Sequence, residues 1–202
     1  MKTPDILSAL DPVIDAFERL AIPYYISGSI ASSLHGMARA TMDIDIVADI
    51  KAVHVTKLKQ FLREDYYIDE DMINSAIETA SSFNLIHFNT AFKIDIFIYK
   101  DEPYQQRALE RRIKDRFDEE RDSYYYFSSA EDSIIAKLKW FEQGNRISER
   151  QWLDVLGVIK VQGENLDIRY LETWTRTLGL FGLLERAFIE CGIEPGRLRQ
   201  RD

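Results

Sequence analysis

The chain of 202 residues is poor in the residue types that build disulfide frameworks and soft-metal sites. Its single cysteine, Cys191, excludes an internal disulfide and a zinc site made of several cysteines. The three histidines, His35, His54 and His87, share no spacing typical of a metal site, and we expect His35 to have a packing role. With 9 glycines and 5 prolines, the chain has no linker rich in these residues and no low-complexity segment.

Long apolar runs and an excess of positive charge are missing as well. No segment approaches the roughly 20 apolar residues of a membrane span, and the first residues lack the basic-then-apolar pattern of a secretory signal. These absences predict a cytoplasmic protein without a membrane partner. The 26 basic residues against 34 acidic ones give a net charge of −8, which disfavours a general nucleic-acid coat.

The hydrophobic pattern divides the chain near Ser128. Before this residue helical and strand-like spacings alternate, and after it every apolar pattern has the period of a helix. The expected helices span 5–20, 29–35, 51–63, 130–141, 148–162, 168–178 and 182–191. The expected strands span 24–28, 43–48, 83–88, 92–99 and 123–127. The sequence therefore predicts an α/β domain over residues 1–128, followed by a C-terminal helical domain over residues 129–202.

Acidic side chains alternate with aliphatic ones in two of the expected strands. Asp43 and Asp45 share one strand face, because successive side chains point to opposite faces. Two carboxylates about 7 Å apart along a strand repel each other unless a cation lies between them, and a hard ion such as Mg²⁺ takes oxygen ligands. Asp95 has the same Ile-Asp-Ile context, so three carboxylates that can hold two metal ions converge if the two strands are neighbours. The alternative is that all three acids face solvent on half-exposed strands.

A glycine–serine pair follows the first expected strand. Gly28 permits close backbone approach, and the free N–H groups at the start of the next helix bind anions, phosphate above all. Ser29 can contact a phosphate or simply cap the helix. Arg39 and Thr41, just upstream of the acids, are further candidates for nucleotide binding, although Arg39 can equally form an ordinary surface ion pair. A Walker A loop is excluded, because no Gly-Lys-Ser/Thr sequence occurs.

In order and spacing, Gly28-Ser29, Asp43-x-Asp45 and the later Asp95 resemble the DNA polymerase β-like nucleotidyltransferase superfamily. The resemblance covers residues 24–98 and implies a nucleotidyltransferase fold with a small mixed sheet. It also implies that the glycine–serine turn holds nucleotide phosphates and that the three acids bind Mg²⁺ or Mn²⁺. The implied activity is metal-dependent transfer of a nucleoside monophosphate from an NTP to an acceptor hydroxyl.

The second half of the chain is similar to the AbiEii-type and MenT-type toxins in residues 128–138 and 150–156. This resemblance implies that Lys137 and Asp154 complete the catalytic site. It further implies that a tRNA end or a protein accepts the nucleotide, and that an antitoxin protein is a partner.

The residues of this half also have ordinary structural interpretations. Ser128 and Glu131 fit a helix capping box, and Arg150 and Asp154 have the spacing of an i, i+4 helix pair. Lys137 can be a solvated helix residue, although it borders the apolar stripe of its helix.

Three other functions stay open at this point. One is nucleotidylation of a small molecule, as in lincosamide or aminoglycoside resistance enzymes, for which an acidic cleft suits a cationic drug. The others are a non-catalytic binding module with the same fold and a structural module bound to an antitoxin.

A basic strip for RNA is also possible, although interleaved acids favour a solvated face. The residues of this strip are Arg107, Arg111, Arg112, Lys114 and Arg116. The aromatic run at 124–127 can stack a base or enter the core.

Overall fold

The computed structural model describes residues 5–117 and 122–193. The chain forms two compact units, one made of residues 1–27 and 40–127 and the other of residues 28–39 and 128–202. The segment 28–39 therefore belongs to the helical unit, whereas the sequence predicted two consecutive segments.

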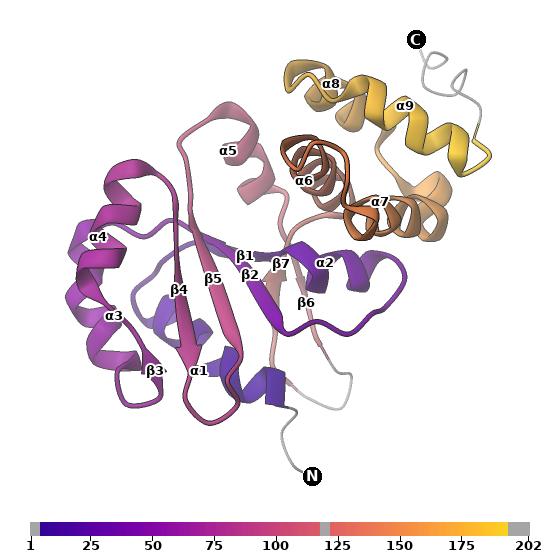
Figure 1. Ribbon diagram of the computed structural model, residues 1–202. Coiled ribbons are helices and arrows are strands. Elements are labelled where there is room, and N and C mark those ends of the chain that lie inside the picture. The colour runs from indigo at the N-terminus through magenta and orange to yellow at the C-terminus, as the bar shows by residue number, and fades with distance from the viewer. Residues whose placement is uncertain (1–4, 118–121, 194–202) are drawn as a thin grey trace. The chain divides into compact units, whose positions relative to one another are not determined.

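In the first unit, seven strands of the described residues form one mixed sheet (Figure 1), with the order β3-β4-β5-β2-β1-β7-β6. The strands are β1 (Tyr24–Ser27), β2 (Asp43–Ala48), β3 (Tyr66–Tyr67), β4 (Ser82–His87), β5 (Lys93–Ile98), β6 (Ile113–Asp115) and β7 (Tyr125–Phe127). Strand β2 is central, because it pairs with β5 in parallel and with β1 in antiparallel orientation. Ile44 and Ile46 on β2 are completely buried. Strand alternation therefore places Asp43 and Asp45 on the opposite face.

Four α-helices among the described residues belong to the same unit. They are α1 (Asp5–Arg19), α3 (Val55–Leu62), α4 (Glu70–Thr79) and α5 (Pro103–Glu110), and a 3₁₀ turn, η1 (Ala52–His54), precedes α3. Helix α1 packs on α3, α3 on α4, and α4 against β4. The apolar face of α1 buries Leu10, Val13 and Phe17 completely, as its spacing predicts.

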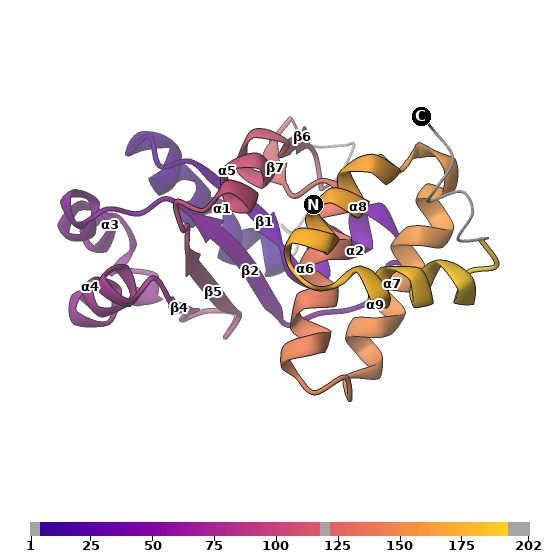
Figure 2. The ribbon, with the colours of Figure 1, turned by 90° about the horizontal axis from the view of Figure 1, so that it is seen from above.

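All regular elements among the described residues of the second unit are helices. It contains α2 (Gly28–His35), α6 (Ala130–Gln143), α7 (Glu149–Gln162), the short η2 (Gly163–Asn165), α8 (Ile168–Thr177) and α9 (Phe181–Glu190). Helices α6 and α7 lie side by side (Figures 1 and 2), and α2 packs against both. At Gly36, after α2, a Cβ atom would lie 2.8 Å from the backbone nitrogen of Val158 on α7. The absence of a side chain at Gly36 therefore permits the close approach of this segment to α7.

The start of α6 differs from the expected capping box of Ser128 and Glu131. The capping residue is Ser129, whose Oγ accepts a hydrogen bond from the backbone N–H of Asp132 at 3.1 Å. Glu131 instead accepts the backbone N–H of Asp167 at the start of α8, at 2.8 Å. The capping-box prediction is therefore wrong. The capping residue is Ser129 rather than Ser128, and the Glu131 side chain bonds to the start of α8 instead of capping α6.

The predicted fold class, an α/β domain followed by C-terminal helices, agrees with this architecture. The short strands β3 and β6 and the helices α4 and α5 lie in segments to which the sequence assigned no definite structure. None of the helices in the described part of the chain is both long and apolar enough to cross a bilayer.

Candidate active site

Two parallel neighbouring strands bring acidic side chains together on one face of the sheet. In the register of β2 with β5, Asp45 lies opposite Asp95, and Asp43 lies opposite Lys93. The face is partly open to solvent, since the side chain of Asp95 is 23% exposed and that of Asp43 is 57% exposed. The two strands that contain these acids are therefore neighbours, as a shared carboxylate site requires.

Lys93 is part of this cluster, and no role for it was predicted from the sequence. Its Nζ lies 2.7 Å from Oδ2 of Asp95 and 3.8 Å from Oδ1 of Asp43. The hydrogen bond to Asp95 and the negative charges of Asp95, Asp43 and Asp45 outweigh partial burial and raise the pKa of Lys93. The sequence contains a signal for this contact, because Lys93 is two residues before Asp95 and both side chains therefore occupy the same strand face.

Carboxylates are the ligands that hard cations prefer, but the three acids do not form a compact metal-binding group. Among residues 5–117 and 122–193, no three His, Cys, Asp or Glu side chains form a group that could hold a metal ion. Asp45 and Asp95 are nevertheless register partners on adjacent strands, which lie about 5 Å apart. Carboxylate oxygens of this kind suit Mg²⁺ or Mn²⁺. A divalent ion shared by Asp43, Asp45 and Asp95 would require Lys93 to leave its place between Asp43 and Asp95.

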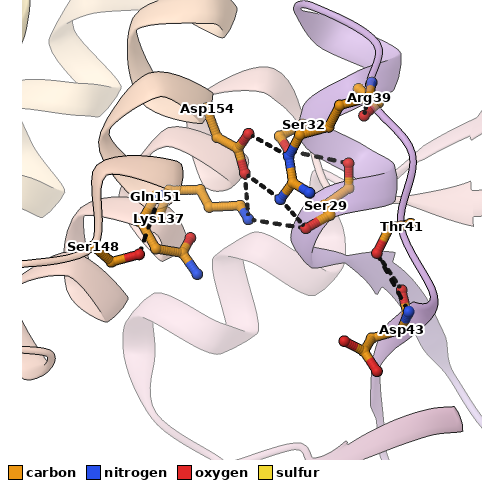
Figure 3. A network of polar contacts seen from close by, with 10 residues as sticks. Ser29, Ser32, Arg39, Thr41, Asp43, Lys137, Ser148, Gln151 and Asp154 are labelled. Carbon is orange, nitrogen blue, oxygen red and sulfur yellow. Dashed lines mark hydrogen bonds and ion pairs between the residues drawn. The ribbon is translucent and has the colours of Figure 1, made fainter.

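The second unit contains a separate polar network around Asp154 on α7 (Figure 3). Arg39 binds Asp154 with two contacts, Nε to Oδ1 at 2.9 Å and Nη2 to Oδ2 at 3.0 Å. Lys137 on α6 places its Nζ 2.8 Å from Oδ2 of the same carboxylate. The side chains of Lys137 and Asp154 are only 4% and 7% exposed. Two ordinary interpretations are therefore wrong: Lys137 is not solvated, and Asp154 pairs with these two cations rather than with the exposed Arg150.

Ser29 completes this network at the start of α2. Its Oγ accepts a hydrogen bond from Nη2 of Arg39 at 2.5 Å and lies 3.5 Å from Nζ of Lys137 (Figure 3). Gly28 precedes it with a φ of +61°, a conformation that favours glycine. The two cations and the carboxylate of Asp154 together have one excess positive charge. The structure thus brings the sequence-predicted residues Ser29, Arg39, Lys137 and Asp154 into one network, with Gly28 next to Ser29 in the chain.

The electrostatics of Asp154 follow from its two partners. Burial by itself raises the pKa of this carboxyl, but the hydrogen bonds from Arg39 and Lys137 and their positive charges outweigh burial. The pKa of Asp154 therefore lies below its ordinary value, and the group is ionised at neutral pH. The Asp154 carboxylate therefore contacts the side chains of both Arg39 and Lys137.

The remaining candidates contact other parts of the protein. Thr41 bonds across a turn, donating to the carbonyl of Asp43 at 3.1 Å and accepting its N–H at 3.3 Å (Figure 3). His35 is buried, with Nε2 2.7 Å from the carbonyl oxygen of Ser128, which agrees with a packing role. Among the residues of the possible basic strip, Arg112 lies over the Tyr126 ring at 4.6 Å from its centroid.

Comparisons with known proteins relate the chain to a fold. No family model matches it, and no curated protein is significantly similar. Among solved structures, the antibiotic-resistance factor ANT(2'')-Ia in solution has a TM-score of 0.55 at 12% identity, covering 91% of this chain and 97% of that one. The complex of ANT(2'')-Ia with adenylyl-2''-tobramycin has a TM-score of 0.55 at 13% identity, covering 86% and 98%. An antigenic nucleotidyltransferase-like protein from Paracoccidioides brasiliensis has a TM-score of 0.51 at 16% identity, covering 92% and 93%. The chain therefore has the nucleotidyltransferase fold, as predicted.

Proposed function

We propose that this protein is a metal-dependent nucleotidyltransferase, which transfers a nucleoside monophosphate from an NTP to an acceptor hydroxyl. The observation that carries the proposal is the pairing of Asp45 with Asp95 on parallel strands, with Asp43 on the same face of β2. A nucleotidyltransferase fold in which these acids share one sheet face is suited to binding the metal complex of a triphosphate.

In this proposal the acids of the first unit have two roles. Asp43 and Asp45 would hold Mg²⁺ or Mn²⁺, which supplies charge stabilisation for the triphosphate and the leaving group. Asp95 would also bind metal and would accept the proton of the acceptor hydroxyl. The acceptor oxygen then forms a bond to the α-phosphorus, the bond between the α-phosphorus and its bridging oxygen breaks, and pyrophosphate leaves.

The residues of the second unit would bind phosphate oxygens. Ser29 offers a hydroxyl and Gly28 a backbone N–H at the start of α2. Lys137 and Arg39 would offset negative charge as it develops on pyrophosphate, with Asp154 holding both in position. Thr41 would contribute by fixing the turn that leads into Asp43.

The acceptor is the finer part of the proposal. The similarity of Lys137 and Asp154 to positions of AbiEii-type and MenT-type toxins supports a tRNA end or a protein as acceptor, with an antitoxin as partner. A cationic small molecule is the second candidate, since the chain has a net charge of −8 and shares its fold with ANT(2'')-Ia, which is known in complex with adenylyl-2''-tobramycin.

Transfer of label tests the activity and separates the acceptors. The full chain is incubated with each α-³²P-labelled NTP and Mg²⁺ or Mn²⁺, together with total tRNA, a cell lysate, or a panel of aminoglycosides and lincosamides. Label that enters one acceptor class with the wild type, and not with Asp45→Asn, supports the proposal and identifies the class. Absence of label from every class with every NTP would contradict it.

A further inference from the structure

We propose that Lys93 is an exchangeable counter-cation, which competes with the divalent metal ion for Asp43 and Asp95 and thereby weakens metal binding in the absence of nucleotide. This inference rests on the proposed function, because it concerns the same carboxylates. It assigns a role to a residue that the resemblance to nucleotidyltransferases does not include.

The register of the two strands puts Lys93 in contact with two of the three acids. Lys93 is the partner of Asp43 across the parallel β2–β5 pair and lies two residues before Asp95 on the same strand face. Its ammonium bonds to Asp95 at 2.7 Å and lies within 3.8 Å of Asp43. An oxygen of Asp95 that binds this ammonium has less capacity to bind a metal ion.

Charge and exposure make this contact an exchangeable one. Three carboxylates and one ammonium have two excess negative charges, whereas the carboxylates without Lys93 have three. The ammonium therefore lowers the attraction that a divalent cation experiences and must also be displaced from Asp95. The Lys93 side chain is 43% exposed and has a flexible stem, so it can turn into solvent at small cost. The metal ion would then enter most readily with the triphosphate, which brings ligands and charge of its own.

Binding of Mn²⁺ to the full chain without nucleotide tests the inference, with free Mn²⁺ measured by electron paramagnetic resonance. Lys93→Met, which keeps an unbranched side chain of nearly the same length and removes its charge, is expected to bind Mn²⁺ about tenfold more tightly than the wild type. Lys93→Arg keeps the charge and is expected to bind as weakly as the wild type.

The chain offers a matched control in Lys51. Its Nζ lies 2.6 Å from Asp49, with side-chain exposures of 58% and 23%, close to the 43% and 23% of the Lys93–Asp95 pair. Asp49 lies six residues after Asp43, just beyond the other end of β2. Lys51→Met should therefore leave Mn²⁺ affinity unchanged.

The outcomes separate this inference from the proposed function. If Lys93→Met binds Mn²⁺ no more tightly than the wild type, while Asp45→Asn loses binding, the competition is overturned and the metal site stands. If Asp45→Asn binds Mn²⁺ as well as the wild type, the metal site itself fails. A tenfold gain in Lys93→Met that disappears in Lys93→Met combined with Asp45→Asn supports both.

Discussion

The ammonium of Lys137 lies 2.8 Å from a carboxylate oxygen of Asp154, and both side chains are more than nine-tenths buried. Arg39 binds the same carboxylate with two hydrogen bonds, so one buried anion holds two cations. Burying charges costs free energy, and the attraction between them offsets that cost only when the geometry is good. The two cations exceed the single carboxylate by one positive charge, so the stability of this network depends strongly on Asp154.

Replacing the shared carboxylate should destabilise the protein strongly. Asp154→Asn leaves Arg39 and Lys137 close together without their anion, and loss of one partner from a buried ionic group costs about 3 kcal/mol of unfolding free energy. Urea unfolding followed by circular dichroism measures the loss.

Glu142→Gln is the control for this substitution. It also removes a carboxylate that binds an arginine with two contacts, at 2.6 and 3.1 Å, but this pair is exposed and joins Glu142 near the end of α6 to Arg146 just beyond the helix. The urea midpoint of Glu142→Gln should equal that of the wild type. Equal losses in the two variants would show that burial of the Asp154 network has no energetic consequence.

The stabilisation by Asp154 should depend on pH in the acid range. Because the folded-state pKa of Asp154 is below its ordinary value, its contribution is fully present above the unfolded pKa of about 4. The contribution is lost as pH falls through the folded pKa, where the carboxyl binds a proton. The difference in unfolding free energy between wild type and Asp154→Asn should stay constant from pH 7 to about pH 5 and shrink below about pH 4. A difference that is the same at pH 3.5 and pH 7 would contradict the depressed pKa.

The strand face of the acids could be predicted from the sequence, whereas the surroundings of Asp154 could not. Period-two alternation is local, so Asp43 and Asp45 fall on one side of β2 as soon as Ile44 is buried. The pairing of Arg39 with Asp154 joins residues 115 positions apart and depends on how α2 packs against α7. No periodicity encodes such a contact, and the i, i+4 interpretation with Arg150 was therefore reasonable and wrong.

Ser29→Ala should weaken nucleotide binding more than folding. The hydroxyl accepts a hydrogen bond from Arg39, whose loss costs about 1 kcal/mol of stability. If Ser29 also binds a phosphate oxygen, calorimetry with a non-hydrolysable NTP and Mg²⁺ should give an affinity roughly tenfold lower.

Ser33→Ala on the same helix is the control, because the Oγ of Ser33 also accepts a hydrogen bond from Arg39. This bond comes from the backbone N–H of Arg39, at 3.3 Å. Equal nucleotide affinities for the wild type and Ser29→Ala would reduce Ser29 to a structural residue.

Lys137→Met should separate a catalytic role from a structural one. The substitution removes one of the two cations, and Asp154 keeps its two-contact pair with Arg39. The loss of stability should therefore be smaller than in Asp154→Asn, about 1–2 kcal/mol. If the ammonium offsets charge on the leaving pyrophosphate, kcat should fall at least tenfold with little change in KM for NTP, since the contact strengthens in the transition state.

Lys137→Arg should restore only part of the rate, because a planar guanidinium replaces a compact ammonium in a buried position. Steady-state kinetics at a temperature well below the Tm of each variant make the comparison. An unchanged kcat in Lys137→Met, together with the expected loss of stability, would assign Lys137 to the fold alone.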